Sequence, residues 1–329
     1  MNNNLIDPFN RKIDYLRVSI TDLCNFRCVY CRPPEGVPLL SHTDILRYEE
    51  ILEIVSVAAE LGIRKIRVTG GEPLVRRGVV DFIRNLTAIN SIMDVGLTTN
   101  GALLPAMAAD LKSAGLNRIN ISLDSLRREV FASITGKDML GTVVDGIKKA
   151  LECGFHPVKI NVVLLKGVNE PDVPEFARIT MDHPVDVRFI ERMPFGGEHA
   201  PLNPPDSFSA FKALDMIRSE VGQLFPVERG PMDGPASMFR LAGAKGGIGV
   251  IDPVTGHFCG TCNRLRLTAK GALRPCLLSS REIDLKSSLR SGLGRKAIAE
   301  IIRNAVYSKP VGRATHLSSL SDGMNSIGG

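Results

Sequence analysis

The sequence predicts an α/β fold: a partial (β/α)6 TIM-like parallel barrel followed by a smaller C-terminal α+β domain. Apolar, strand-like runs alternate with amphipathic stretches of helical period through the first two-thirds of the chain. This pattern changes after a Pro- and Gly-rich segment at 193–207, beyond which short strands dominate. We therefore expect a barrel domain over residues 1–222 and a second domain over residues 223–329.

Six segments have the composition of buried strands, namely 15–21, 65–70, 94–99, 118–124, 157–164 and 186–191. Amphipathic stretches such as 43–62 and 140–154 lie between them. A strand, a helix and a second strand at this spacing form a right-handed crossover, which makes the strands parallel. Because a complete barrel of this type has eight units, six units are compatible with an open partial barrel or with a doubly wound sheet.

The last third begins with a helical pattern at 208–221. Three short strand-like runs follow, at 222–228, 237–243 and 247–253, and a group of cysteines comes after them. No internal repeat accompanies this change, so we interpret it as a second domain of different architecture.

The composition, with 44% hydrophobic and 23% charged residues, is that of an ordinary globular protein. A net charge of +6 suits a small polyanion such as a nucleotide. The lack of Trp and the presence of only four Tyr argue against a nucleic-acid surface. The N-terminal segment has no secretory pattern, and no run of about 18 apolar residues occurs. We therefore expect a cytoplasmic protein that binds neither nucleic acid nor a membrane.

Three cysteines, Cys24, Cys28 and Cys31, follow the first predicted strand. Parallel α/β folds place their active sites at this end of the strands. Three thiolates leave one iron of a [4Fe–4S] cluster without a protein ligand, and that iron can bind a small molecule through an amine and a carboxylate. A zinc site with a distant fourth ligand is the alternative.

The segment 68–74, VTGGEPL, follows the second predicted strand. Gly70 and Gly71 allow the backbone to approach a ligand closely, and the Glu72 carboxylate can accept a hydrogen bond from an ammonium group. A plain glycine-rich turn is the alternative.

A second triad consists of Cys259, Cys262 and Cys276. By spacing alone, a zinc site completed by His257 and a second iron–sulfur cluster are about equally compatible with it. In a cluster, the second open iron could bind a substrate. Arg264 and Arg266 follow at strand spacing, and a paired guanidinium face suits phosphate or a carbonyl-rich base.

Strand alternation predicts a polar barrel interior. Arg17, Arg67 and Lys159 each share a strand face with small polar residues. If those faces point inward, three cations converge on one pocket. Because buried unpaired charges are costly, such a cluster implies an anionic ligand, and a triphosphate would fit. The alternative is that these faces point outward.

The loop CNFRCVYC, 24–31, resembles the signature of the radical S-adenosylmethionine (SAM) superfamily, and GGEP, 70–73, resembles its second motif. Within that superfamily, the C-terminal triad and the terminal Gly-Gly resemble the GTP 3′,8-cyclase family (molybdenum cofactor biosynthesis protein A). The likeness covers nearly the whole chain, including the stretches 14–31, 66–78, 98–101, 119–126, 159–169, 188–194, 258–268 and 326–329. Arg32 and Lys270 depart from the expected pattern outside the ligand set.

The resemblance implies two [4Fe–4S] clusters and SAM as cofactors and GTP as the substrate. The implied cluster ligands are Cys24, Cys28 and Cys31 for the first cluster and Cys259, Cys262 and Cys276 for the second. The implied SAM-binding residues are Tyr30, Gly70, Gly71, Glu72, Ser122 and Met193. The implied GTP-binding residues are Arg17, Arg67, Thr98, Lys159, Arg264, Leu265 and Arg266. The implied catalytic residues are Arg17, Arg264, Arg266, Gly328 and Gly329.

The same resemblance implies the product 3′,8-cyclo-7,8-dihydroguanosine triphosphate, made in the first step of molybdopterin synthesis. The implied partners are a cyclic pyranopterin monophosphate synthase and a low-potential electron donor such as a flavodoxin, and a homodimer is compatible with the pattern. Two alternatives remain: a radical SAM enzyme that modifies a peptide or RNA, and a non-catalytic zinc or iron–sulfur module that binds nucleic acid.

Overall fold

The computed structural model describes residues 4–31, 39–193, 208–228, 230, 234–254, 256, 259–279 and 281–312. In this part of the chain, one mixed sheet has the strand order β12-β11-β10-β1-β2-β3-β4-β5-β6-β9-β8-β7. The strands are β1 (Tyr15–Ser19), β2 (Lys65–Thr69), β3 (Asp94–Thr99), β4 (Arg118–Ser122), β5 (Val158–Leu164), β6 (Val185–Glu191), β7 (Leu224–Val227), β8 (Ser237–Leu241), β9 (Gly247–Ile251), β10 (Arg264–Leu267), β11 (Ala272–Arg274) and β12 (Ile283–Asp284).

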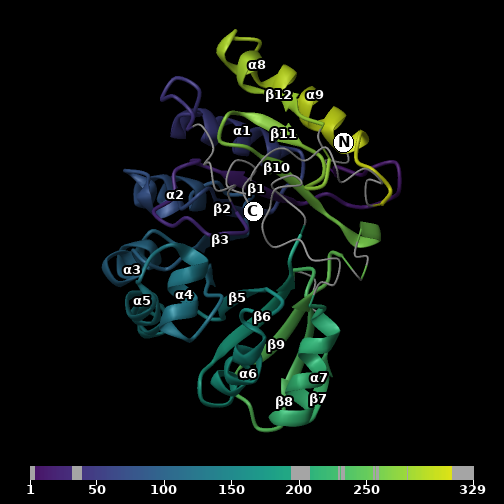
Figure 1. Ribbon diagram of the computed structural model, residues 1–329. Helices are drawn as coiled ribbons and strands as arrows, with labels where there is room; N and C mark the ends of the chain where they lie inside the picture. Colours follow the sequence, from purple (N-terminus) through teal and green to yellow (C-terminus); the bar gives the residue numbers. More distant parts are fainter. Residues whose placement is uncertain are drawn as a thin grey trace.

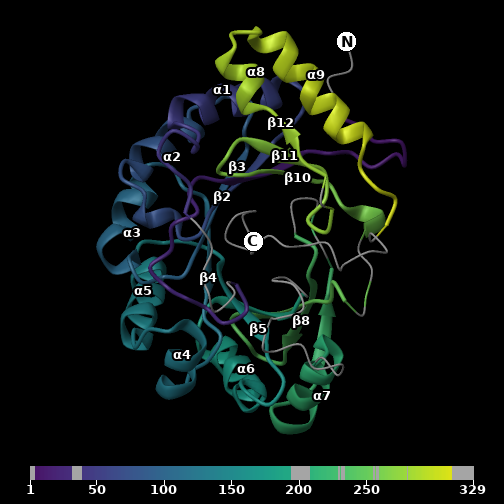
Figure 2. The same cartoon turned by 45° about the horizontal axis from the view of Figure 1, so that its top comes forward.

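The first six strands confirm the predicted parallel α/β core, since β1 to β6 pair in sequence order and in parallel. Two strands from the last third extend it: β10 pairs in parallel with β1, and β9 pairs in parallel with β6. The outer strands β7, β8, β11 and β12 are joined by antiparallel pairing. The strands curve around a central space (Figures 1 and 2).

Helices connect the strands and cover the outer side of the curved sheet (Figure 2). They are α1 (Tyr48–Glu60), α2 (Val79–Thr87), α3 (Leu104–Ser113), α4 (Arg128–Thr135), α5 (Leu140–Glu152), α6 (Val173–Asp182), α7 (Ala210–Glu220), α8 (Lys286–Arg290) and α9 (Gly294–Tyr307). The amphipathic stretches predicted at 43–62, 140–154 and 208–221 contain α1, α5 and α7. None of the helices in the described ranges is long and apolar enough to cross a membrane.

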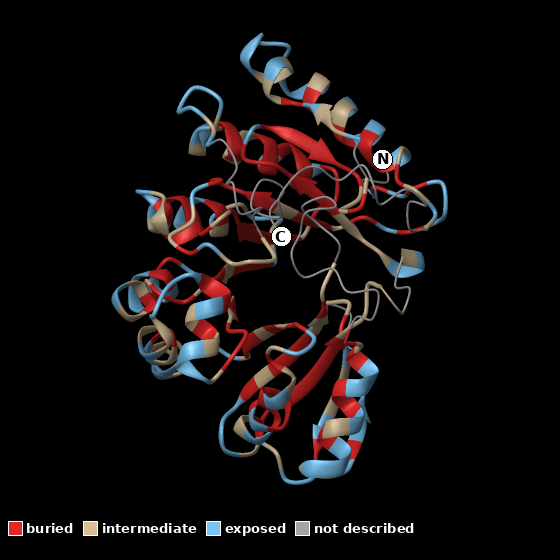
Figure 3. Ribbon diagram, viewed as in Figure 1, coloured by how far each residue is buried: buried red, intermediate tan, exposed pale blue. Residues whose placement is uncertain are grey.

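The hydrophobic core lies between the sheet and these helices. Figure 3 shows buried residues along the strands and exposed residues mainly on the outer faces of the helices. Alternate positions of β1 and β2, such as Leu16, Val18, Ile66 and Val68, are almost fully buried within the core cluster. The opposite faces of the same strands carry Tyr15, Arg17, Lys65 and Arg67, and all of these except Arg17 are also buried, as is usual for parallel strands.

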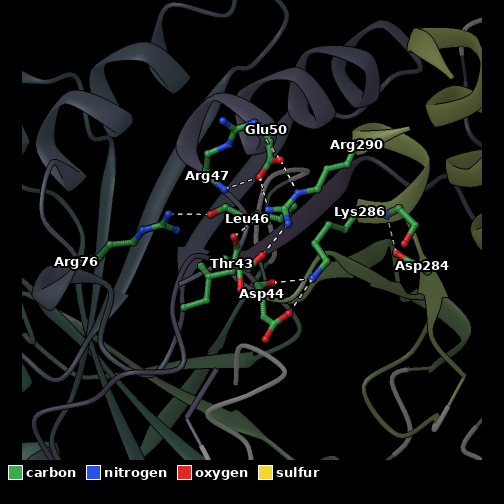
Figure 4. Close-up of polar contacts among 11 residues, drawn as sticks. Thr43, Asp44, Leu46, Arg47, Glu50, Arg76, Asp284, Lys286 and Arg290 are labelled. Atoms are coloured by element: carbon green, nitrogen blue, oxygen red, sulfur yellow. Dashed lines mark hydrogen bonds and ion pairs between the residues drawn. The ribbon is translucent and has the colours of Figure 1, made fainter. Parts of the chain in front are cut away.

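The C-terminal helices attach to the segment that precedes α1 and to α1 itself (Figure 4). Arg290 at the end of α8 forms an ion pair with Glu50 in the first turn of α1, with 2.8 Å between Nε and Oε1. The same guanidinium donates to the carbonyl oxygen of Thr43 at 2.7 Å, and the Lys286 ammonium lies 3.6 Å from the Asp44 carboxylate. Strands and helices of the last third therefore pack on elements of the predicted barrel domain, and the boundary at 222/223 stays a prediction.

Candidate active site

A cavity of about 350 Å³ is lined by residues from the inner face of the parallel strands. The strands β1 to β6, β9 and β10 contribute side chains to its lining, together with loops at their ends. All six cysteines of the two triads line this cavity. Loops that are far apart in the sequence therefore meet at one site.

The polar strand faces predicted from alternation do point into the cavity. Arg17, Arg67 and Lys159 all line it, as do Arg264 and Arg266. In the sheet register Arg17 lies opposite Arg67 on one side and Arg266 on the other. Since neighbouring strands lie about 4.8 Å apart, these three arginines form a row of adjacent backbone positions, and the charge of Arg17 repels those of both neighbours. We call this row, with Lys159, the cationic wall.

A glycine makes room for one member of the wall. Gly96 lies opposite Arg67 on the inner face of β3. A Cβ atom at Gly96 would lie 2.2 Å from the Arg67 guanidinium. The missing side chain lets Arg67 extend across β3, where its Nη1 donates to the carbonyl oxygen of Leu97 at 3.3 Å.

The electrostatics of the wall favour an anionic occupant. Burial lowers the pKa of Arg17 and lowers that of Arg266 strongly, and the neighbouring arginines lower both further by repulsion. Burial likewise lowers the pKa of Arg188 to about 10, and repulsion from Arg67 adds to the shift. A bound polyanion would relieve this repulsion, because buried positive charge is stabilised by a nearby negative charge.

Several buried polar atoms around the cavity also lack a partner among the described residues. They are Thr98 Oγ1, Asn120 Oδ1, Asn161 Oδ1 and Arg188 Nε. Buried polar groups in folded proteins are nearly always hydrogen-bonded. A ligand with many hydrogen-bonding atoms, such as a nucleotide, would satisfy these groups.

The loop that carries Cys24, Cys28 and Cys31 is fixed by its backbone. The amides of Arg27 and Val29 donate to carbonyl oxygens of Thr135 and Ile134 at the end of α4, at 2.8 and 2.9 Å. Within the loop, the Cys31 amide donates to the Cys28 carbonyl oxygen at 3.0 Å. These bonds orient the loop so that all three cysteine side chains line the cavity.

The aromatic residue of the first loop is held by a carboxylate beyond β4. Tyr30 donates its hydroxyl to Asp124 Oδ2 at 2.6 Å, and Asp124 Oδ1 accepts from the Val163 amide at 2.8 Å. Burial raises the pKa of Asp124 to about 6, although both hydrogen bonds lower it. The Tyr30 ring is thus fixed beside the cysteines.

Gly70 and Gly71 line the cavity and also support the first cysteine loop. A Cβ at Gly71 would lie 2.3 Å from the carbonyl oxygen of Leu23, and one at Gly70 would lie 2.7 Å from that of Thr21. The Gly71 amide donates to Thr21 O at 2.7 Å. In the structure, the two glycines therefore allow the loop after β2 to approach the backbone of the loop after β1 closely. The sequence had suggested that they allow the backbone to approach a ligand.

Glu72 lies outside the cavity lining and is only 1% exposed. Its carboxylate accepts hydrogen bonds from the Leu74 amide at 3.0 Å, the Thr99 hydroxyl at 2.8 Å and the Asn100 amide at 2.6 Å. Burial raises the pKa of Glu72 to about 7 against the opposing effect of these bonds. In this arrangement Glu72 ties the loop after β2 to the end of β3.

The second triad lies at the opposite end of the parallel strands from the first, since it precedes β10, which runs parallel to β1, and follows β11, which runs antiparallel to β10. Cys259 and Cys262 are in the segment between β9 and β10, and Cys276 follows β11. Arg264 and Lys309 lower the pKa of the Cys262 thiol to about 7, although burial opposes the shift. Thiolate is the form that binds metals.

Both triads supply the soft sulfur ligands that iron–sulfur clusters require, and their three-thiolate sets fit clusters with one open iron. Within the described ranges, no group of three or more His, Cys, Asp or Glu side chains could hold a metal ion as placed. His257, the alternative zinc ligand, lies outside those ranges.

Most of the predicted site residues lie in this cavity. Besides the cysteines, the lining includes Arg17, Tyr30, Arg67, Gly70, Gly71, Thr98, Ser122, Lys159, Met193, Arg264 and Arg266. Glu72 and Leu265 lie outside the lining, and the Leu265 side chain is buried in the core on the opposite face of β10. The predictions for Gly328, Gly329 and Arg32 fall outside the described residues.

The sequence reasoning missed other members of the lining: Tyr15, Lys65, Arg118, Asn120 and Arg188. Tyr15, Lys65, Arg118 and Asn120 each lie at an even spacing from a predicted site residue on the same strand, so alternation continued along β1, β2 and β4 would have found them. Arg188 lies on β6, which carries no predicted site residue, and only the pairing of β6 with β5 places it opposite Asn161.

The chain is similar to known proteins over nearly its whole length. Residues 18–179 match the family model described as the radical SAM superfamily, and residues 185–315 match the one described as molybdenum cofactor synthesis C. A protein named GTP 3′,8-cyclase from Thermodesulfovibrio yellowstonii is 48% identical over 324 residues, which cover 98% of this chain and 99% of the relative. A protein of the same name from Geobacter sulfurreducens is 49% identical over 308 residues, which cover 93% of each chain.

Solved structures show the same fold. The structure of SuiB from Streptococcus suis bound to S-adenosylmethionine aligns with a TM-score of 0.66. The alignment covers 92% of this chain and 68% of SuiB at 12% identity, so the likeness concerns the fold alone. The nearly full-length identity to the curated relatives is much more specific. The chain therefore belongs to the GTP 3′,8-cyclase family of the radical SAM superfamily.

Proposed function

We propose that the chain converts GTP to (8S)-3′,8-cyclo-7,8-dihydroguanosine 5′-triphosphate, the first step of molybdenum cofactor biosynthesis. One observation carries the proposal: the two cysteine triads and the cationic wall line the same cavity. A radical generated at one triad would thus meet a nucleotide bound between the two. The family relationship supports the same reaction.

SAM and a [4Fe–4S] cluster are the cofactors of the radical SAM superfamily. In this chain Cys24, Cys28 and Cys31 would hold the cluster. The chemistry supplied there would be one-electron reductive cleavage of the SAM sulfonium, with the electron coming from the reduced cluster and ultimately from the low-potential donor. The residues proposed to bind and orient SAM are Tyr30, Gly70, Gly71, Glu72, Ser122 and Met193. Tyr30 is held by Asp124, whereas Glu72 would act through Thr99 and Asn100, with which it is hydrogen-bonded.

We assign a second [4Fe–4S] cluster to Cys259, Cys262 and Cys276, whose open iron would meet the guanine base. GTP would be bound by the cationic wall, that is Arg17, Arg67, Arg266 and Lys159, together with Thr98 and Arg264. Leu265, the remaining proposed GTP-binding residue, would contribute through its backbone, because its side chain is buried in the core. Arg17, Arg264 and Arg266 would also act on the reacting nucleotide, together with Gly328 and Gly329. Arg188 and Lys65 line the same cavity and extend its positive charge.

The wider assignments are part of the same proposal. A cyclic pyranopterin monophosphate synthase would consume the product, and a low-potential donor such as a flavodoxin would supply electrons. We also propose that the chain divides into two domains between residues 222 and 223 and that it forms a homodimer.

Reconstitution tests the proposal. After anaerobic loading with iron and sulfide, the chain should hold about eight irons, four for each cluster. With SAM and a strong reductant, the release of 5′-deoxyadenosine should depend on GTP. About four irons per chain would contradict the second cluster, and SAM cleavage that ignores GTP would contradict the substrate.

A variant separates the roles of the two triads. Cys259→Ala should keep the iron of the first triad and should still cleave SAM, but it should form no cyclised nucleotide. Cys153→Ala is the matched control, because Cys153 lies at the end of α5 and outside the cavity lining. A Cys259→Ala protein that still made the cyclised product would remove the second triad from the reaction.

A further inference from the structure

Two buried cations from the two ends of the described chain meet at the second cysteine triad. Lys309 follows α9, and Arg11 precedes β1. Their exposed fractions are only 4% and 8%. Neither lines the cavity, so the proposed function gives them no role.

Lys309 is bonded to the backbone beside two of the cysteines. Its ammonium donates to the carbonyl oxygen of Arg264 at 2.7 Å and to that of Pro275 at 2.8 Å. It also lies 3.9 Å from Cys262 Sγ. An ammonium group has three donors, so these contacts account for all of them. One side chain therefore links the chain next to Cys262 with the chain next to Cys276.

Arg11 holds the third cysteine. Its Nη1 donates to the carbonyl oxygen of Cys259 at 2.7 Å, and its Nη2 donates to that of Pro310 at 2.7 Å. The remaining Nε is paired with Asp7 at 2.5 Å. Because Pro310 directly follows Lys309, the two cations are connected to each other. The backbone near all three cysteines is thus held from both ends of the described chain.

The charge of Lys309 needs a counter-charge at this place. A buried ammonium is costly unless an anion lies nearby. The contacts of Lys309 in the described structure are two carbonyl oxygens and one cysteine sulfur, and Arg11 is paired with Asp7. The Cys262 sulfur is the member of the triad that contacts Lys309, and as a cluster ligand it would face the ammonium as a thiolate. Such a cation would stabilise the reduced, more negative state of a cluster bound there.

We infer that Lys309 and Arg11 are positioning residues for the second triad, and that Lys309 also raises the reduction potential of the cluster bound there. This inference rests on the proposed second cluster. Residues 308–312, which directly follow α9 and have no part in the proposed function, thereby gain a physical role.

The experiment isolates the second triad. In a full-length background in which Cys24, Cys28 and Cys31 are Ala, only the second triad can bind a cluster. Lys309→Met removes the charge and keeps the length of the side chain. Lys309→Arg keeps the charge, and Lys296→Met is the matched control, since Lys296 is an exposed lysine on α9. Each protein is reconstituted anaerobically and titrated with reductant while the cluster is followed by its paramagnetic resonance.

Lys309→Met should lower the ratio of reduced to oxidised cluster about tenfold at a fixed applied potential, which is about 59 mV for one electron. Lys309→Arg should restore most of the ratio, and Lys296→Met should leave it unchanged. An unchanged ratio in a folded Lys309→Met protein would overturn the effect on potential. If Lys309→Met does not fold, Lys309→Gln applies the same charge test.

Amide hydrogen exchange of the cluster-free protein tests whether Lys309 and Arg11 position the second triad, independently of whether a cluster binds there. Arg11→Met and Lys309→Met should each speed amide exchange at Cys259–Asn263 and around Cys276, and Lys296→Met should not. Unchanged exchange in both variants would overturn the positioning role. If the background protein itself binds no iron, the second cluster fails, and the inference about its potential fails with it. If the background protein binds its cluster normally and Lys309→Met changes neither the reduced fraction nor the amide exchange, the inference is refuted and the proposed function is unaffected.

Discussion

Tyr15 is a phenol buried among cations, and its protonation state changes the charge that an anionic ligand meets. Its hydroxyl accepts a hydrogen bond from Arg67 Nε at 3.3 Å, and the Lys65 ammonium lies 5.1 Å from its ring centroid. Burial alone would raise the pKa of Tyr15. Arg67, Arg17 and Lys65 outweigh burial and lower the pKa to about 7. Near neutral pH, Tyr15 can therefore carry a negative charge beside Arg67.

This titration predicts a pH dependence for GTP binding. As pH rises above 7, ionised Tyr15 would repel the triphosphate and compete with it for Arg67. The affinity for GTP should therefore fall about three- to tenfold between pH 7 and 8.5, because a ligand that binds the protonated form better loses affinity as the proton leaves. Tyr15→Phe should remove this fall. Calorimetric titration of GTP into the protein at several pH values measures it.

Tyr48→Phe is the matched control for this prediction. Tyr48 stacks on Phe82 outside the cavity, and burial raises its pKa to about 12, above the tested range. It should therefore keep the wild-type pH profile. A Tyr15→Phe protein that lost affinity between pH 7 and 8.5 as the wild type does would show that another group is responsible.

At the scale of elements, the strands were predictable because their signal is local. Each of the six predicted segments overlaps its observed strand closely, and 94–99 coincides with β3. Alternation within each strand also placed Arg17, Arg67 and Lys159 on polar strand faces, and the structure shows that these faces line the cavity. The positions of β9 and β10 were not predictable in this way. Each pairs with a strand far away in the sequence, and such pairing leaves no periodic pattern in the chain.

The ion pair between Arg290 and Glu50 joins α8 to α1, which gives a second prediction (Figure 4). Glu50 is hydrogen-bonded to Arg290, an interaction that outweighs burial and lowers the pKa of Glu50 to about 2. Arg290→Leu should lower the free energy of unfolding by about 2 kcal/mol at pH 7, at the lower end for charged hydrogen bonds because Arg290 is partly exposed. Urea denaturation measures this loss.

The sign of the pH effect follows from the direction of the pKa shift. The folded-state pKa of Glu50 lies below its ordinary value of 4.5, so the stabilisation is complete above about 4.5 and is lost as pH falls towards 2. The difference between wild type and Arg290→Leu should therefore shrink as the pH is lowered through this range. Arg295→Leu, which breaks the exposed pair with Glu60, should cost less than about 0.5 kcal/mol. Equal losses in the two variants at pH 7 would contradict this account.

At the scale of the whole molecule, the segment between β9 and β10 links the two edges of the parallel strands. β9 adjoins β6 and β10 adjoins β1, and Cys259 and Cys262 lie on the chain that passes between them. The spacing of the second triad and its resemblance to a family indicated that the triad belongs to the active site. The sequence could not indicate that Arg11 and Lys309 hold the backbone near this triad, because no local pattern relates side chains separated by almost 300 positions.

This connection predicts that loading the second triad stabilises the sheet as a whole. A cluster bound to Cys259, Cys262 and Cys276 would join the segment after β9 to the end of β11, and a group that binds only the folded state raises its stability. The loaded wild type should therefore melt at least about 5 °C above a loaded variant with these three cysteines changed to Ala, in anaerobic calorimetry. Amide exchange in β9 and β10 should be slower in the loaded wild type. The cluster-free forms of the two proteins should differ much less. If β9 and β10 exchanged equally fast in the two loaded proteins, the segment would not link the edges of the sheet, whatever the cluster does in the reaction.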